Sequence, residues 1–306
     1  MIREAVEALD DAGVRYSFRK GPRTDAQLPA GGEIDLAVER SEMKKVHCAL
    51  TGAGFFHLQA PGHLDHHFYV TARDGLWLKV DLKTPAGAAS AGFLGRLRRS
   101  LGMRRPVGLR RAGPVVAIVG PDGAGKGSLI DLLRARLPLG VAVVYFGAPK
   151  KAGSPRAEAT PPPEESPNPL RECAWIVLRW GKAWRRLLGA YARAWRGSVV
   201  LCDRYPVEVL ATRPRRTRLG APIERALFGR LVPLPDALVV LDAPGEALFV
   251  RKGEHSPEIL ERWRRGYVES LGPKGARIVS TDRPLEESFA EVSDIVFEQL
   301  RARRRW

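Results

Sequence analysis

The chain has little cysteine and no long apolar segment. Its 306 residues include only three cysteines, and these are widely spaced. Such spacing makes neither a disulfide framework nor a zinc site, and it favours a reducing compartment. No run approaches the ~18 apolar residues that a transmembrane helix needs. The N-terminal residues also lack an apolar signal core. We therefore expect a cytoplasmic protein without a transmembrane segment.

Acidic residues are scarce compared with basic ones. The chain has 34 Asp and Glu against 50 Lys and Arg, which gives a net charge of +16. This charge suits phosphates, nucleic acid or an anionic membrane surface, and arginine supplies bidentate contacts to phosphate. A general drift of composition toward arginine explains the same numbers, so charge alone leaves both interpretations open.

The length and the changes in composition indicate two domains and a linker. Residues 1–95 predict a small α/β domain, and residues 96–113 predict a basic linker because arginines alternate with glycines there. The expected helices of this first domain occupy residues 2–11 and 41–53, the second with Ser41 as its N-cap. Its expected strands occupy residues 14–18, 34–38, 67–70 and 76–82.

Residues 114–306 have the pattern of a larger α/β domain. Short apolar runs alternate there with helical stretches, which predicts a doubly wound parallel sheet with helices on both faces. The expected strands occupy residues 115–119, 141–145, 198–202, 237–241 and 277–280. Residues 175–195 predict a helix covering the sheet. Its apolar face would carry Trp180, Trp184, Leu187, Leu188, Tyr191 and Trp195. An acceptor wall or a membrane-surface helix is the other interpretation.

A glycine-rich segment follows the first of these strands. Gly120, Gly125 and Lys126 satisfy the G-x-x-x-x-G-K frame between that strand and a helix, which is the context a phosphate-binding P-loop requires. Glycines allow backbone N–H groups to face phosphate oxygens, and the helix adds its positive end. The predicted ATP-binding residues are Gly120, Asp122, Gly123, Ala124, Gly125, Lys126, Gly127 and Ser128. Because Gly127 follows the lysine, Ser128 is the candidate hydroxyl for Mg²⁺.

Four motifs in residues 114–306 resemble those of thymidylate kinases, which belong to the nucleoside monophosphate kinase branch of P-loop proteins. Residues 122–126 match the family's Asp-Gly-Ala-Gly-Lys loop, and residues 203–205 match its Asp-Arg-Tyr motif. Residues 235–244 are similar to its next strand and turn. Residues 251–254, followed by Glu261 and Tyr267, are similar to its lid, and residues 281–285 to its adenine-contacting loop.

The resemblance implies an ATP- and Mg²⁺-dependent kinase that transfers the γ-phosphoryl group to a small phosphorylated acceptor. It implies that Arg204 binds the acceptor's phosphate, with Asp122 and Tyr205 beside it. Asp203 would hold Mg²⁺ together with Ser128. Lys126 and Arg251 would neutralise charge on the transferring group.

The segment after Asp-Arg-Tyr departs from thymidylate kinases. Residues 206–210 lack the family's small polar residues and its Tyr-Gln, which puts thymine recognition in doubt. The arginine-rich residues 213–220 fit either a polyanionic acceptor or a solvated loop. This version more closely resembles thymidylate-kinase-like proteins of bacterial glycan and sugar-phosphate pathways, so the acceptor is either a nucleoside monophosphate or a sugar phosphate.

Residues 31–36 of the first domain resemble the acidic strand of nucleotidyltransferase-fold proteins. Glu33 and Asp35 share one face of a strand and could hold one Mg²⁺, with Asp81 as the third carboxylate. The family's upstream Gly-Ser is here Gly21-Pro22. An active domain and an inactive scaffold therefore both stay open.

Two alternative functions follow from these features. One is a sugar or polyol kinase of a glycan or natural-product pathway, bifunctional with a nucleotidyltransferase front domain. The other is a nucleic-acid-binding protein that uses ATP as a switch, which the charge and the basic linker favour. It ranks lower because Asp203, Arg204 and Arg251 have no purpose there. A homodimer is left open.

Overall fold

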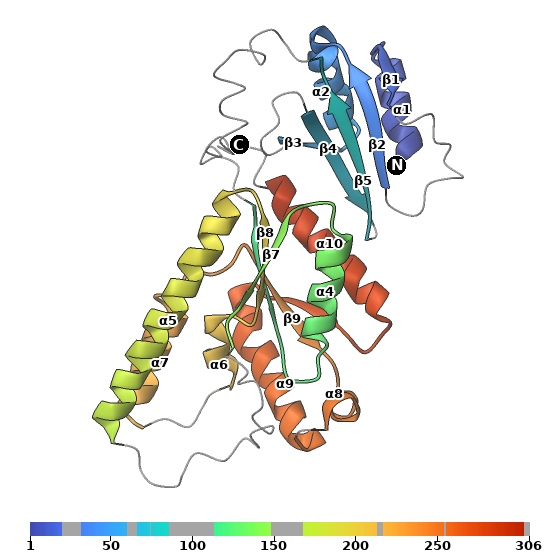
Figure 1. Cartoon of the computed structure of the whole chain (residues 1–306). Coiled ribbons are helices and arrows are strands. Elements are labelled where there is room, and N and C mark those ends of the chain that lie inside the picture. The colour runs from blue at the N-terminus through green and yellow to red at the C-terminus, as the bar shows by residue number, and fades with distance from the viewer. Residues whose placement is uncertain are drawn as a thin grey trace, which may run out of the picture. The chain divides into compact units, whose positions relative to one another are not determined.

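The computed structural model describes residues 1–19, 32–59, 66–73, 75–85, 113–147, 168–212, 217–253 and 255–302. The chain divides into two compact units (Figure 1). The front unit comprises residues 1–112 with 297–306, and the second unit comprises residues 113–296. Predictions for Gly21-Pro22, for the linker residues 96–112 and for the arginines at 213–216 lie outside the described residues.

The front unit is a mixed five-stranded sheet in the order β1-β2-β5-β4-β3. Its elements are α1 (Ile2–Asp11), β1 (Tyr16–Phe18), β2 (Gly32–Val38), α2 (Met43–Gly52), β3 (Phe56–Gln59), β4 (His66–Arg73) and β5 (Leu76–Lys83). Strands β2 and β5 run parallel, and the other neighbouring strands run antiparallel. Apolar residues of β2 and β5 pack with α1 and α2 into one core.

One local prediction for the front unit was wrong, and one strand was missed. Ser41 is not an N-cap, because a 3-10 turn over Arg40–Glu42 precedes the helix and the Ser41 hydroxyl donates to Glu39 at 3.4 Å. Strand β3 was not predicted. It contains only two apolar side chains, and its pairing with β4, which places Phe56 opposite Val70, is a tertiary contact.

The second unit is a five-stranded sheet in the order β10-β9-β6-β8-β7, and every neighbouring pair is parallel. Its strands are β6 (Val115–Val119), β7 (Val141–Tyr145), β8 (Val199–Asp203), β9 (Ala237–Asp242) and β10 (Arg277–Ser280). Its helices are α4 (Lys126–Arg136), α5 (Pro169–Trp195), α6 (Val209–Thr212), α7 (Gly220–Gly229), α8 (Gly245–Lys252), α9 (Pro257–Leu271) and the part of α10 (Leu285–Ala302) up to Val296. All five predicted strands are confirmed.

Strand β6 lies at the centre of this sheet and is completely buried. The chain passes from β6 to the edge strand β7 and returns to β8 between them, whereas β9 pairs with the other side of β6. The strand order therefore reverses next to β6. Open parallel sheets bind ligands beyond the carboxyl ends of the strands at such a reversal. This topology places the candidate site after β6 and β8.

Helix α5 confirms the predicted helix but not its entire predicted apolar face. Leu187 is buried, and Trp180, Trp184 and Tyr191 pack against the core beneath it. Leu188 and Trp195 instead face solvent, with exposed fractions of 62% and 56%. Among the described residues, no helix combines the length and apolar character needed to cross a membrane.

Candidate active site

The glycine-rich loop between β6 and α4 adopts a conformation that needs glycine. Gly120 has φ 148° and Gly123 has φ 88°, values that L-residues rarely adopt. A Cβ atom at Gly120 would lie 2.7 Å from the backbone oxygen of Leu241, and one at Gly123 would lie 2.8 Å from that of Leu248. The loop therefore packs closely against β9 and α8, which supports a tight turn facing the open end of the sheet.

Lys126 begins α4 and is buried beneath this loop. Its ammonium group donates to the backbone oxygens of Gly120 at 2.7 Å and Pro121 at 2.8 Å. Burial lowers the pKa of Lys126. Gly127 and Ser128 are exposed in the first helical turn. Unbonded N–H groups of a first turn attract anions, so this end of α4 suits phosphate oxygens.

Arg204 follows β8 and has φ 67°, the one positive φ of a non-glycine residue in the described part of the chain. Such a conformation costs about 1–2 kcal/mol and is common at functional sites. Its backbone N–H donates to Ile118 of β6 at 3.1 Å, and its guanidinium donates to Asp122 at 2.8 Å. The structure thus brings Arg204 to the glycine-rich loop, as the sequence predicted for Asp122 and its arginine partner.

Asp122 joins two cations. Its carboxylate lies 2.8 Å from Arg204 and 3.5 Å from Nζ of Lys252, which ends α8. Burial by itself would raise the pKa of Asp122, but Arg204, Lys126 and Lys252 outweigh burial and lower it. The Asp122 carboxylate is therefore held ionised, and it keeps the two cations beside the loop.

Glu208 is the main charged residue that the sequence analysis missed. It ends a 3-10 turn after Tyr205, is buried, and has a carboxylate oxygen 3.8 Å from Arg204. Burial raises its pKa to about 7, although Arg204 and Lys126 oppose that change. The position of Glu208 five residues after Asp203 was visible in the sequence, but only folding places it between the loop and Arg204.

Asp203 ends β8, and in the parallel register it lies opposite Ile118 of β6, two residues before Gly120. The structure therefore places Asp203 beside the start of the loop. Carboxylate and hydroxyl oxygens are ligands that Mg²⁺ accepts, usually with several waters. Asp203 and the exposed Ser128 together are a donor set suited to that ion.

Two predicted site residues do not face this site. Tyr205 is 1% exposed, and its hydroxyl donates to the backbone oxygen of Pro233 at 2.8 Å, which argues against contact with a substrate. Arg251 donates to the backbone oxygen of Thr281 at 2.8 Å, so it is tied to the predicted adenine-contacting loop. Its neighbour Lys252 is the cation that lies at Asp122.

The predicted lid residues of α9 have structural contacts. Glu261 accepts the backbone N–H of Gly245 at 3.1 Å and pairs with Arg264 at 2.8 Å. Arg264 in turn binds the Asp242 carboxylate in a bidentate pair at 2.7 and 3.0 Å. Tyr267 is buried, and its pKa is raised by burial and by the neighbouring Glu208. These contacts join α8, α9 and the end of β9.

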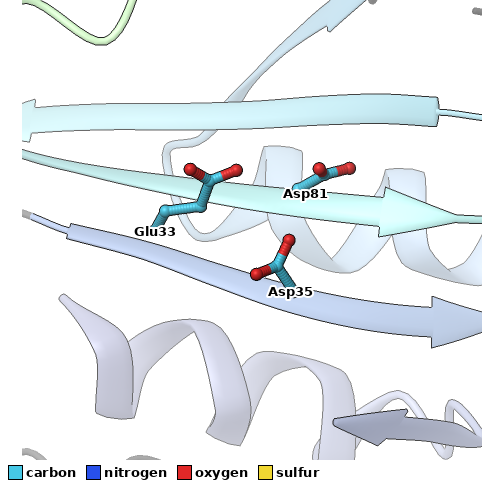
Figure 2. A group of neighbouring side chains, drawn as sticks. All are labelled: Glu33, Asp35 and Asp81. Carbon is cyan, nitrogen blue, oxygen red and sulfur yellow. The ribbon is translucent and has the colours of Figure 1, made fainter. Parts of the chain in front are cut away.

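The three predicted carboxylates of the front unit lie together. Figure 2 shows Glu33 and Asp35 on β2 and Asp81 on β5, with Asp35 and Asp81 opposite each other in the parallel register. One oxygen from each lies within 4.8 Å of the others. Each carboxylate also has a basic neighbour. The pairs are Glu33–Lys79 at 2.8 Å, Asp35–Arg19 at 3.8 Å and Asp81–His66 at 3.0 Å.

Comparison with known proteins identifies related sequences but no family model. No protein-family model matches the chain. Over 201 residues it is 28% identical to ribose 1,5-bisphosphate phosphokinase PhnN of Chromobacterium violaceum, and the match covers 64% of this chain and 97% of that protein. The chain resembles P-loop kinases. This similarity supports a P-loop phosphotransferase and does not define the acceptor.

Two further comparisons cover a short segment and the fold. Over 45 residues the chain is 49% identical to hemin import ATP-binding protein HmuV of Vibrio parahaemolyticus, and this match spans only 15% of the chain and 17% of that protein. The structure of thymidylate kinase from Candida albicans is also similar. The match covers 61% of this chain and 92% of that kinase, with 14% identity and a TM-score of 0.45.

Proposed function

We propose that the second unit is an ATP- and Mg²⁺-dependent kinase that transfers the γ-phosphoryl group to a small phosphorylated acceptor. One observation carries this proposal: Arg204 reaches the glycine-rich loop of Lys126 and binds its Asp122 at 2.8 Å. A phosphate-binding loop and a second phosphate-binding cation therefore face the same place, as transfer between two phosphorylated molecules requires.

The loop and Lys126 bind the donor. Backbone N–H groups of residues 123–128 would bind the terminal phosphates of ATP, and the N-terminal end of α4 would add its positive potential. Lys126 donates to two carbonyl oxygens of the loop, and it would contact the β- and γ-phosphates when ATP is bound. The chemistry is positioning and neutralisation of charge, with no covalent enzyme intermediate.

Asp203 and Ser128 would hold Mg²⁺, which would neutralise charge on the phosphates when it is bound. Asp203 lies at the carboxyl end of β8, and Ser128 lies in the first turn of α4. The two oxygen ligands would therefore come from two different elements, a strand end and a helix N-terminus.

Arg204 binds the phosphate of the acceptor through its planar guanidinium. That phosphate takes over part of the contact that Asp122 makes in the unliganded protein. Glu208 positions Arg204, because a carboxylate oxygen of the buried Glu208 lies 3.8 Å from the guanidinium of Arg204. Arg251 donates to the backbone oxygen of Thr281, and it would have to leave this contact to add positive charge at the transferring phosphoryl group.

A sugar phosphate is our preferred acceptor, and a nucleoside monophosphate is the alternative. Two features favour a sugar phosphate: the similarity to ribose 1,5-bisphosphate phosphokinase, and the segment 206–210, which lacks the base-contacting residues of thymidylate kinases. The acceptor's own phosphate binds at Arg204 in both cases.

The test is acceptor-stimulated ADP formation across nucleoside monophosphates, ribose phosphates including ribose 1,5-bisphosphate, and other sugar phosphates. We expect one class to stimulate turnover, and Lys126→Ala to reduce that turnover at least 100-fold. Arg134→Ala, which removes an exposed cation at the other end of α4, is the matched control and keeps full turnover. Turnover unaffected by Lys126→Ala, or absent with every acceptor, contradicts the proposal.

For the front unit we propose a nucleotidyltransferase-like domain in which Glu33, Asp35 and Asp81 bind a divalent cation. The convergence of the three carboxylates supports the cation site. The basic neighbours Lys79, Arg19 and His66 support an inactive scaffold instead. Formation of a nucleotidyl-transfer product that Asp35→Ala abolishes would distinguish the active domain from the scaffold.

A further inference from the structure

The outward face of α5 combines exposed apolar side chains with cations. The helix has 27 residues and is therefore about 40 Å long. Leu170, Leu178 and Leu188 have exposed fractions of 78%, 63% and 62%, and Trp175 and Trp195 are about half exposed. At 3.6 residues per turn, Leu170, Leu188 and Trp195 form one stripe at roughly 100° around the helix from the buried Ile176 and Leu187. Leu178 lies opposite the buried residues, and Trp175 lies on the far side of Leu178 from this stripe.

Exposed cations lie on the solvent-facing side of α5 next to this apolar stripe. The exposed basic residues are Arg171, Lys182, Arg185, Arg193 and, just after the helix, Arg196. The one acidic residue of α5, Glu172, is buried and accepts the backbone N–H of Thr217 at 3.1 Å. Arg179 and Arg186 are partly buried and bind Glu224 and the Gly147 carbonyl instead. The outward face thus carries no negative charge of its own.

Contacts with the rest of the second unit account for the apolar side chains on the inward side of α5 but not for those on its outward side. Trp180, Trp184 and Tyr191 contact the core, and α7 lies alongside the helix (Figure 1). Burial of the outward leucines would each contribute roughly 1.5–3 kcal/mol, so their exposure is costly for a surface with no partner.

We propose that the outward face of α5 binds an anionic lipid surface. Helices that lie in a membrane interface place Leu and Trp among the acyl chains while Lys and Arg contact the acidic headgroups. The combination of cations and leucines favours an acidic lipid surface over two other binding partners, a second copy of this chain and a nucleic acid. A second copy of this helix would bring cations against cations, and nucleic acid would use the cations but leave the leucines in water.

The experiment is flotation of the full chain with vesicles of phosphatidylcholine containing phosphatidylglycerol, compared with vesicles of phosphatidylcholine alone. We expect binding to the anionic vesicles only, and weaker binding as salt rises. The double variant Lys182→Gln/Arg185→Gln should bind about 25-fold more weakly, at roughly fivefold for each cation. Arg134→Gln/Arg262→Gln has the same net charge but changes exposed cations on α4 and α9, and it should bind like the wild type.

The apolar contribution has its own variant. Leu178→Ser/Leu188→Ser should also lose vesicle binding, whereas Leu234→Ser/Ile278→Ser, which changes exposed apolar residues elsewhere, should not. A blue shift of tryptophan emission on anionic vesicles should shrink in Trp175→Phe/Trp195→Phe. All variants are exposed-residue changes, so an unaltered circular dichroism spectrum confirms that each is folded.

Three results would overturn the proposal. The first is absence of binding, or equal binding to neutral vesicles. The second is a homodimer, measured by sedimentation equilibrium without lipid, that the leucine variant dissociates. The third is tight oligonucleotide binding that is lost in the cation variant and kept in the leucine variant, together with no requirement for the leucines on vesicles.

Discussion

The candidate active site and the carboxylate cluster of the front unit differ in where their charged residues lie along the strands. Glu33, Asp35 and Asp81 lie within β2 and β5, where alternation and register alone bring them together. Asp122 and Arg204 lie beyond β6 and β8, on irregular backbone with a positive φ at Arg204.

The two sites therefore bring charged side chains together in two different ways. A regular strand places carboxylates at fixed spacing without backbone strain, and here each of them lies beside a basic residue, as Glu33 does beside Lys79. Strand ends let side chains from distant segments converge, at the cost of strained positions such as Arg204. Substitutions at the two sites should therefore differ in their effects on stability and turnover.

Glu208 should make stability depend on pH. Its pKa is about 7 in the folded protein and 4.5 as an ordinary carboxyl group, so the unfolded chain releases this proton first as pH rises. The stability that this pKa difference contributes is therefore fully present below pH 4.5, and this contribution is lost as the pH rises through about 7. Between these values the difference in unfolding free energy between wild type and Glu208→Gln should change by roughly 3 kcal/mol.

Urea unfolding at a series of pH values measures this difference. The groups facing Glu208 are Arg204, Lys126, Asp203, Tyr267 and the backbone of Gly120. A difference that stays constant across this pH range would show that Glu208 is ionised in the folded state, and it would weaken its assignment as a buried positioning residue.

Substitution of Arg204 should lower kcat/KM for the acceptor more than kcat/KM for ATP. Arg204→Ala removes the guanidinium that would bind the acceptor's phosphate, and we expect kcat/KM for the acceptor to fall about 100-fold, since a hydrogen bond to a charged group contributes roughly 1.5–3 kcal/mol. Arg204→Lys keeps the charge but loses the planar fork, so a loss of about tenfold is expected. Steady-state kinetics with each substrate varied measures both, with Arg134→Lys as control.

An equal loss for ATP and acceptor would contradict this assignment. In that case Arg204 would serve the loop through Asp122 rather than the acceptor.

Gly123→Ala and Gly127→Ala should change the free energy of unfolding in opposite directions. Gly123→Ala adds a Cβ 2.8 Å from a backbone oxygen at φ 88°, and it should lower the unfolding free energy by about 2 kcal/mol. Gly127 lies in α4 with no atom within 4 Å of the added Cβ, so Gly127→Ala should raise it by up to about 1 kcal/mol. Thermal denaturation without nucleotide compares them. Equal effects would mean that the loop conformation is not fixed in the free protein.

Mg²⁺ should stabilise the front unit if its carboxylates bind a cation. At ten times the dissociation constant the gain is about 1.4 kcal/mol. Asp35→Asn should abolish this gain, whereas Asp203→Asn, at the other candidate site, should retain it. Thermal denaturation without ATP measures the change. No stabilisation of wild type by Mg²⁺ or Mn²⁺ would favour the scaffold interpretation.

The sequence predicted the fold of the second unit closely, because its central strands β6, β8 and β9 are short apolar runs that are buried along almost their whole length. Val115–Val119 is the clearest case. The front unit was predicted less completely. Its strand β3 depends on pairing with β4, and the turn before α2 depends on the buried Glu42, whose carboxylate lies 3.1 Å from Lys45.

The candidate site was predictable where one segment carries the signal. The loop from Gly120 to Ser128 is continuous in sequence, and the Asp-Arg-Tyr motif identified Asp203 and Arg204. Glu208 and Lys252 were missed because their roles depend on distances between elements. Tyr205 was assigned to the substrate because a motif does not reveal that its side chain turns into the core.

By itself, the sequence determined the parallel α/β architecture, the phosphate-binding loop and the pair of carboxylates on β2. These features depend on local spacing and hydrophobic pattern, which neighbouring residues alone specify. The tertiary structure decided that Arg204 meets Asp122, that Lys252 rather than Arg251 joins them, and that α5 turns leucines and cations outward. These outcomes depend on strand order and helix packing, because they join side chains that are far apart along the chain.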